Sequence, residues 1–171
     1  ISAPGTYRIP LVYGNAIERS TTNSSAYTSS KTKVMGSEEF VLQEFVDHND
    51  HKITSPYINL QNAGDPATKA KVVWEDCQDI VTTPAVTGSG ADSYLTFTID
   101  KNKLQNGNAV VAVTNATGTV MWSWHLWFTP KSSLKKIPFT SGGTTYNFMT
   151  DNLGWKYTKW TGGLKREVVV K

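Results

Sequence analysis

Hydrophobic and polar residues alternate most regularly between positions 93 and 129. The segment SYLTFTI (93–99) places large apolar side chains at every second residue, which is typical of a strand with one buried face. NAVVAVT (108–114) and TVMWSWHLWFT (119–129) continue in the same way, and the turn signals NG and NATG separate the three segments. The pattern predicts three antiparallel strands joined by two tight turns, a β-meander.

Strand-like segments also lie on both sides of this region. In TYRIPLVYGN (6–15), Pro10 predicts a strand at a sheet edge or at a bulge, because proline cannot donate a ladder hydrogen bond. EEFVLQEFVD (38–47) fits a short helix or a strand, and its periodicity does not decide between them. The other predicted strands are KVVWED (71–76), CQDIVTTPAV (77–86), TYNFM (145–149), WKYTKW (155–160) and REVVV (166–170).

About eight short strands with turns between them predict an all-β fold, an antiparallel β-sandwich with at most one short helix. The length of 171 residues suits a single domain over residues 1–171, and abundant threonine favours strands over helices. Cys77 is the one cysteine, so an internal disulfide is impossible. Because the chain begins with Ile1 and ends on an apolar run, we expect a domain excised from a longer multidomain protein.

The tryptophan-rich segment MWSWHLWFTP (121–130) carries the most distinctive side chains. In a strand, alternate residues point to opposite faces. One predicted face is continuously apolar and is expected to be buried in the core; it holds Trp122, Trp124, Leu126 and Phe128. The opposite face is mixed and holds Met121, Ser123, His125, Trp127 and Thr129.

The mixed face raises the possibility of carbohydrate binding. A pyranose packs its C–H face on a flat aromatic ring and needs hydrogen-bonding groups beside it. Trp127 and His125, with Trp155 or Trp160 close in space, form a candidate glycan platform. The alternatives are that a loop or the C-terminal segment covers Trp127, and that His125 is a hydrogen-bonded strand histidine.

Candidate catalytic and metal-binding groups are sparse. VDHNDH contains Asp47, His48, Asp50 and His51, but the spacing His48–His51 in a polar loop is a weak metal signal, and we predict no metal site. The thiol of Cys77 lies beside carboxylates, which raise a thiol pKa and disfavour a nucleophile. Glu75, Asp76 and Asp79 fit an exposed turn better than an acid/base pair. We therefore predict neither catalysis nor a cofactor.

Charge adds little to this interpretation. The net charge is +3, and residues 131–171 hold eight of the 17 lysines and arginines. These cations are spaced between apolar residues, as solubilising side chains are, and no nucleic-acid-binding motif accompanies them. We expect no nucleic-acid partner, and no apolar run is long enough to span a membrane.

Several blocks of the sequence resemble one protein family. GNAVVAVTNATGTVMWSWHLWFT (107–129) is similar to a segment of fimbrillin-like surface proteins of Bacteroides-group bacteria. APGTYRIPLVYGNAI (3–17), KVVWED (71–76) and NFMTDNLGW (147–155) look like further blocks of the same proteins, in the same order. The WSWH block is fairly specific, whereas DNLG alone is weak.

The resemblance implies a fimbrillin-like or Ig-like sandwich module exported to the cell surface, attached to the outer membrane through a parent protein. It implies cell adhesion or fimbria assembly, with neighbouring domains or subunits as partners through strand-edge pairing, and no catalytic residues. Our first hypothesis is therefore a non-catalytic structural or adhesive module. The second is a carbohydrate-binding module for a host or dietary glycan, which requires exposed tryptophans.

Overall fold

The computed structural model of this protein describes residues 1–28 and 45–158. Its strands are β1 (Gly5–Pro10), β2 (Ile17–Glu18), β3 (Thr21–Thr22), β4 (Lys69–Glu75), β5 (Thr82–Thr87), β6 (Tyr94–Ile99), β7 (Gly107–Thr114), β8 (Val120–Phe128), β9 (Lys136–Ser141) and β10 (Thr144–Met149). Its helices are α1 (Ile58–Gln61) and the 3-10 turns η1 (Ser24–Ala26), η2 (Gly90–Asp92) and η3 (Lys131–Leu134).

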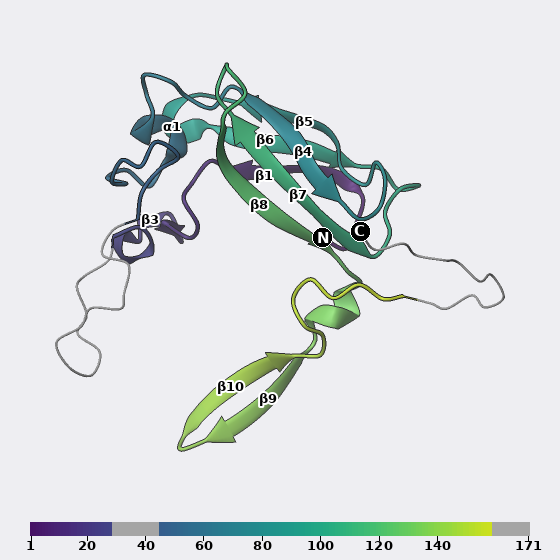
Figure 1. Ribbon diagram of the computed structural model, residues 1–171. Helices are drawn as coiled ribbons and strands as arrows, with labels where there is room; N and C mark the ends of the chain where they lie inside the picture. The colour runs from purple at the N-terminus through teal and green to yellow at the C-terminus, as the bar shows by residue number, and fades with distance from the viewer. Residues whose placement is uncertain (29–44, 159–171) are drawn as a thin grey trace, which may run out of the picture.

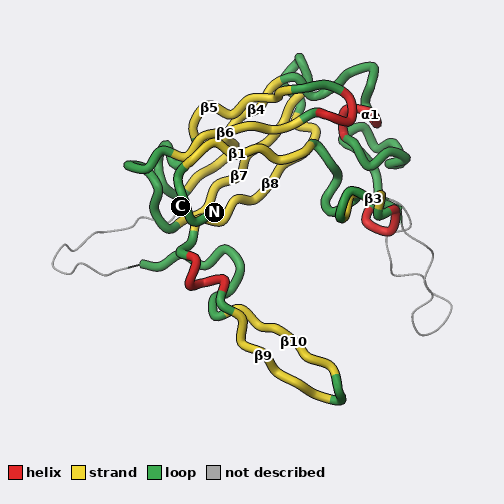
Figure 2. The backbone as a smooth tube through the Cα atoms, turned by 180° about the vertical axis from the view of Figure 1, so that it is seen from behind, coloured by secondary structure: helices red, strands yellow, loops and turns green. Residues whose placement is uncertain are grey.

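Two three-stranded antiparallel sheets form the body of the molecule. One has the order β1-β6-β5 and the other β4-β7-β8. The sheets face each other, and the helical turns and long loops lie at the ends (Figures 1 and 2). This arrangement confirms the prediction of an all-β, antiparallel sandwich-like fold with one short helix.

The core lies between the two sheets and follows the alternation of the sequence. The inward side chains of β6 are 0–1% exposed, and those of β7 are completely buried. Burying a side chain of this size contributes roughly 1.5–3 kcal/mol. The inward residues are Leu95, Phe97 and Ile99 from β6 and Ala109, Val111 and Val113 from β7.

The predicted apolar face of β8 also points into the core. Phe128 is completely buried and Leu126 is 6% exposed. Trp122 and Trp124 are half-buried and pack against the core, and the Trp122 ring meets Tyr13 edge-on at 5.2 Å between ring centroids. They keep some exposure because β8 is an edge strand of its sheet.

Met121 departs from the predicted alternation. The pairing of β7 with β8 shifts register between Val113 and Thr114, opposite Trp122 and Val120, so Met121 lies at a bulge. A bulge adds one residue to a strand and redirects a side chain. Met121 is consequently 3% exposed in the core cluster, and its predicted place on the mixed face is wrong.

The predicted meander over 93–129 is also wrong in one connection. β7 and β8 form an antiparallel hairpin around the turn at 115–118, as expected. β6 and β7, however, belong to opposite sheets, so residues 100–106 cross between layers instead of forming a tight turn. β6 and β7 would bury the same faces whether they were neighbours in one sheet or packed against each other from two sheets. The alternation of apolar residues therefore cannot distinguish these two arrangements.

The edges of the sandwich agree with the sequence where the structure describes them. β1 pairs only with β6, and Pro10 ends it, which confirms the edge prediction for this proline. Of the predicted strand 77–86, only the part from Thr82 onward is a strand, and 77–81 form turns. The predicted strand at 155–160 is not formed over 155–158. Most of segment 38–47 and all of 166–170 lie outside the described residues.

A separate hairpin of β9 and β10 projects from one end of the sandwich (Figure 1). Ser141 pairs with Thr144, so the loop has two residues, Gly142 and Gly143. Both have positive φ, 55° and 79°, as a type I′ turn requires. This turn matches the right-handed twist of the two strands, which explains why the glycine pair closes a hairpin here.

Candidate functional site

The residues predicted to form a glycan platform occupy different environments. Trp127 is 8% exposed on the outer face of β8, and its indole Nε1 donates to the Trp155 carbonyl oxygen at 2.9 Å. The Trp155 side chain is 51% exposed. His125 is exposed and its Nε2 is hydrogen-bonded to Asn108 Oδ1 at 2.8 Å. Trp160 lies outside the described residues.

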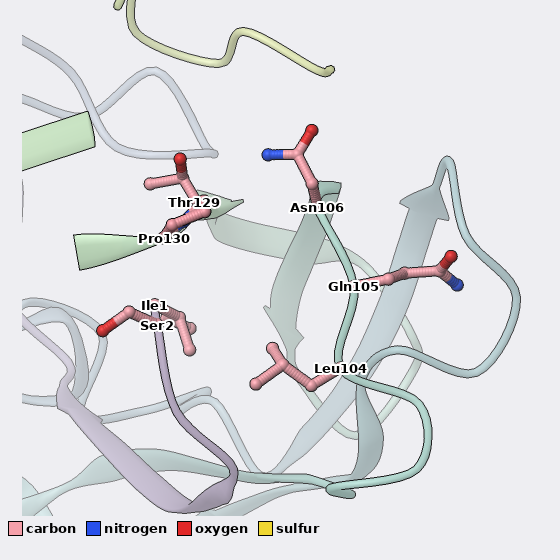
Figure 3. A pocket seen from close by; sticks show the side chains of 7 residues that line it. All are labelled: Ile1, Ser2, Leu104, Gln105, Asn106, Thr129 and Pro130. Carbon is pink, nitrogen blue, oxygen red and sulfur yellow. The ribbon is translucent and has the colours of Figure 1, made fainter. Parts of the chain in front are cut away.

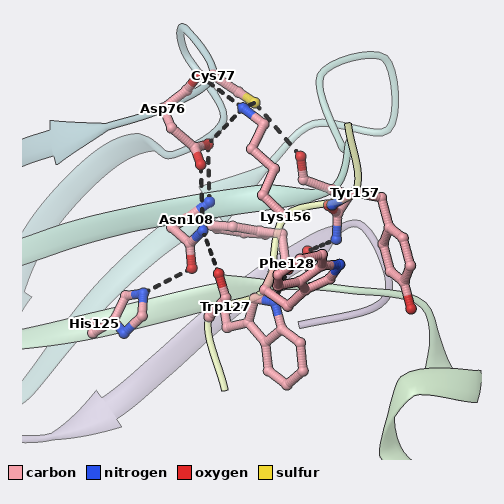
Figure 4. Close-up of polar contacts among 11 residues, drawn as sticks. Asp76, Cys77, Asn108, His125, Trp127, Phe128, Lys156 and Tyr157 are labelled. Atoms are coloured by element: carbon pink, nitrogen blue, oxygen red, sulfur yellow. Dashed lines mark hydrogen bonds and ion pairs between the residues drawn. The ribbon is translucent and has the colours of Figure 1, made fainter. Parts of the chain in front are cut away.

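This placement supports the alternatives considered for Trp127 and His125. A stretch of chain after the hairpin, residues 152–157, runs along the outer face of the β4-β7-β8 sheet and covers Trp127 (Figure 4). Trp127 and Trp155 are close in space, and a hydrogen bond joins the Trp127 indole to the Trp155 backbone. Because Trp127 is buried, it presents little ring area to a sugar.

Asn108 on β7 is the centre of the contacts that hold residues 152–157. Its side-chain nitrogen donates to the Gly154 carbonyl oxygen at 3.0 Å and to Asp76 Oδ2 at 3.3 Å. Its side-chain oxygen meets His125 Nε2, and since an amide oxygen only accepts, this His125 nitrogen carries the proton. One amide therefore joins β4, β8 and the segment 152–157 (Figure 4).

Lys156 fastens the same segment to the end of β4. Its Nζ donates to the Asp76 carbonyl oxygen and to Cys77 Sγ, each at 3.2 Å, and lies 3.3 Å from Asp76 Oδ1. Burial and the nearby Asp76 raise the pKa of Cys77, so the thiol is protonated at neutral pH, as the sequence predicted. The hydrogen bond with Cys77 contributes most to a raised pKa of Lys156.

Asp76 makes the stability of this region depend on pH. Burial alone raises its pKa, but hydrogen bonds from Asn108, Cys77 and Lys156 outweigh burial, and the net pKa lies below the ordinary 3.8. A carboxylate with a depressed folded-state pKa stabilises the fold above its unfolded-state pKa, and this stabilisation disappears as the pH falls through the folded-state value.

We therefore expect Asp76→Asn to be less stable than the wild type at about pH 6, and the difference to shrink as the pH falls to about 2.5. The measurement is urea unfolding followed by tryptophan fluorescence across this pH series. Asp92→Asn is the matched control, since the Asp92 carboxylate bonds to no described residue. A difference that stays constant at every pH would contradict the role given to Asp76.

Gly154 lets the segment approach the sheet this closely. Its φ is +80°, which favours glycine, and a Cβ here would lie 3.2 Å from His125 Cε1 and 3.4 Å from Asn108 Oδ1. The Tyr157 backbone N–H then donates to Asn106 Oδ1. The sequence alone did not reveal that the glycine of DNLG approaches the WSWH strand, because this contact is long-range.

A small apolar hollow lies where β8 leaves the sandwich (Figure 3). It has a volume of about 290 Å³ and is formed around Ile1, Leu104 and Pro130. The Ile1 carbonyl accepts a hydrogen bond from the Thr129 backbone N–H at 3.0 Å, which holds the first residue against the end of β8. The hollow is next to the connection that leads to the β9–β10 hairpin.

Asp47 of the VDHNDH segment has a local structural role. Asp47 Oδ1 accepts hydrogen bonds from the backbone N–H groups of Asn49 and His51, at 2.9 and 3.1 Å, which closes the loop. Asp47 Oδ2 accepts from the Gln61 side chain at 3.2 Å. In the part of the chain that the structure describes, no group of three or more His, Cys, Asp or Glu is placed to hold a metal ion.

The β9–β10 hairpin presents an exposed apolar surface. Phe139 pairs with Tyr146 and Ile137 pairs with Phe148, so these four side chains share one face. Each is more than half exposed, at 53% for Ile137, 58% for Phe139, 51% for Tyr146 and 57% for Phe148. We call these four residues the hairpin face.

No protein-family model, curated protein or solved structure matches this chain. Among the described residues, no helix is long and apolar enough to cross a membrane.

Proposed function

We propose that this chain is a non-catalytic structural and adhesive module of a bacterial cell-surface protein of the fimbrial type. In this proposal the parent protein attaches the module to the outer membrane, and its partners are neighbouring domains or subunits of a surface assembly. The support from sequence is the resemblance of 3–17, 107–129 and 147–155 to fimbrillin-like proteins. A sandwich-like fold agrees with that resemblance.

The hairpin face is the observation that carries the proposal. Every residue of β9 and β10 is exposed, although four large apolar side chains are aligned on one side. An isolated two-stranded hairpin is marginally stable in water, and contiguous exposed apolar surface marks interaction sites. A neighbouring domain that covers this face removes the apolar area from water and stabilises the hairpin.

The sandwich edges offer a second means of contact. Within the described residues, β1 and β8 each pair with one strand only, and both lie along the same side of the sandwich (Figure 1); Ile1 occupies the end of the β8 edge, at Trp127 and Thr129. An exposed strand edge has free N–H and C=O groups that accept a strand from another chain. This supports the proposal that strand-edge pairing contributes to assembly.

Site-specific photocrosslinking on cells that display the parent protein tests the role of the hairpin. Phe139 is replaced by the photocrosslinking residue p-benzoylphenylalanine. On irradiation we expect a covalent adduct with a second polypeptide, because position 139 lies in the centre of the hairpin face. The readout is a mobility shift of the tagged protein, followed by mass spectrometry of the adduct.

The matched control carries the same photocrosslinking residue at Thr140, the next position, whose side chain points to the opposite face of β9. We expect little or no adduct from position 140. Equal adduct from both positions would indicate random collisions, and no adduct from either would show that the hairpin face has no protein neighbour. Either result would overturn the proposal.

A further inference from the structure

A larger pocket lies at the side of the sandwich where β1 and β8 have their free edges. Its volume is about 530 Å³, within the range of small-molecule sites. Its lining includes Ile9 and Pro10 at the end of β1, Trp124 of β8 and Asp92 of η2. The pocket is separate from the hairpin face and from residues 152–157.

Three aromatic side chains line this pocket and keep their polar atoms free. Tyr57, Tyr94 and Trp124 are half-buried, and neither phenol group nor the indole N–H bonds to a described residue. The corresponding polar atoms of other aromatic residues form hydrogen bonds. The Trp127 indole N–H donates to the Trp155 carbonyl oxygen, and the Tyr13 hydroxyl oxygen accepts from the Asn62 side chain. The pocket therefore combines apolar ring faces with unused hydrogen-bonding groups.

Asp92 and Ser20 add polar groups to the lining of the pocket. Asp92 is the one charged residue among those that line the pocket, and its carboxylate bonds to no described residue. Ser20 also lines the pocket, in the two-residue turn Arg19–Ser20 of the β2–β3 hairpin, where both residues have positive φ, 49° and 67°, as a type I′ turn requires.

We propose that this pocket binds a neutral hexose unit of a glycan chain. The C–H face of the sugar packs on the Trp124 ring, and neighbouring hydroxyl groups donate to the Asp92 carboxylate. The free hydroxyl groups of Tyr57, Tyr94 and Ser20 supply further hydrogen bonds around the ring. A purely apolar ligand leaves these polar groups unpaired, which costs binding free energy.

The Asp92 carboxylate also selects among sugars; the Arg8 guanidinium, which lies over the Tyr94 ring at 4.8 Å, does not itself line the pocket. A carboxylate is an acceptor only and repels a carboxylate of the ligand, so a sialic or uronic acid is disfavoured in this pocket. This site goes beyond the assembly role proposed above, and it uses Trp124 where the sequence pointed to Trp127. Loss of sugar binding would leave contacts through the hairpin face intact, because the pocket and the hairpin face share no residue.

Isothermal titration of the purified chain tests the proposal. The probes are lactose, maltotetraose, cellotetraose and mannotetraose, with sialyllactose as the acidic counterpart of lactose. We expect at least one neutral sugar to bind. Asp92→Asn is expected to weaken that binding by about tenfold, the loss typical of a hydrogen bond to a charged group. Sialyllactose is expected to bind more weakly than lactose.

Two more variants separate binding from folding. Tyr57→Phe removes only a hydroxyl group and is expected to weaken binding with an unchanged circular dichroism spectrum. Trp124→Ala is expected to abolish binding, whereas Trp155→Ala, which changes an exposed tryptophan outside the pocket, is expected to preserve it. The proposal fails if no neutral sugar binds, or if binding depends on Trp155 and not on Trp124.

Discussion

Phe128→Ala is expected to lower the free energy of unfolding by about 3–5 kcal/mol. Phe128 is completely buried at the end of β8, in the core between the two sheets. Truncation removes its transfer free energy and leaves a cavity that a close-packed sandwich cannot refill. Urea unfolding at neutral pH, followed by circular dichroism, measures the loss.

Phe139→Ala is the matched control for this prediction. The substitution is the same, but Phe139 is 58% exposed on the hairpin and pairs only with Tyr146 across β10. We expect a loss below about 1 kcal/mol, the range of a cross-strand pair. Similar losses for the two variants would mean that β8 does not face the core, and the sandwich described above would be wrong.

Gly107→Ala is expected to destabilise the chain by about 2–3 kcal/mol. A Cβ on Gly107 would lie 2.3 Å from Asp76 Oδ1. This carboxylate cannot turn away freely, because Oδ1 accepts the Asn108 backbone N–H at 2.9 Å and pairs with Lys156. The added methyl group therefore displaces Asp76 and weakens the attachment of residues 152–157. Thermal unfolding measures the loss, and increased hydrogen exchange at the Trp127 indole N–H reports the release of the segment.

Gly64→Ala provides the corresponding control. Nothing lies within 4 Å of a Cβ at Gly64, and its backbone does not require glycine. We expect a change within about 0.5 kcal/mol, as for other surface substitutions. If Gly107→Ala were as mild as Gly64→Ala, the close approach of Asp76 to β7 would not exist in the folded protein.

The candidate sites show how far sequence reasoning reached. The tryptophan strand and its inward face were predictable from alternation, whereas the closeness of Trp127 to Trp155 was not, because it joins residues 28 positions apart in the chain. The covering of Trp127 was one of two alternatives, and only the contacts of Asn108, Gly154 and Lys156 decide between them. The pocket beside Trp124 was not predicted, because it joins residues from four separate parts of the chain.

What the sequence determined by itself is which residues form strands and which face of each strand is buried. A period of two is a local property, so Leu95, Phe97 and Phe128 could be assigned to the core without knowledge of the fold. The edge position of β1 followed in the same way from Pro10, because a missing N–H excludes a central strand.

Only the tertiary structure decided which strands are neighbours. A strand buries the same face whether the next strand pairs beside it or packs against it from the opposite sheet, so β6 and β7 were placed in one sheet when they lie in two. The role of Gly107 also depends on the tertiary structure. The sequence assigned this glycine to a turn, but in the fold its lack of a side chain allows the Asp76 carboxylate to lie against β7. Pairing and close approach depend on residues distant in the chain, and local alternation carries no information about them.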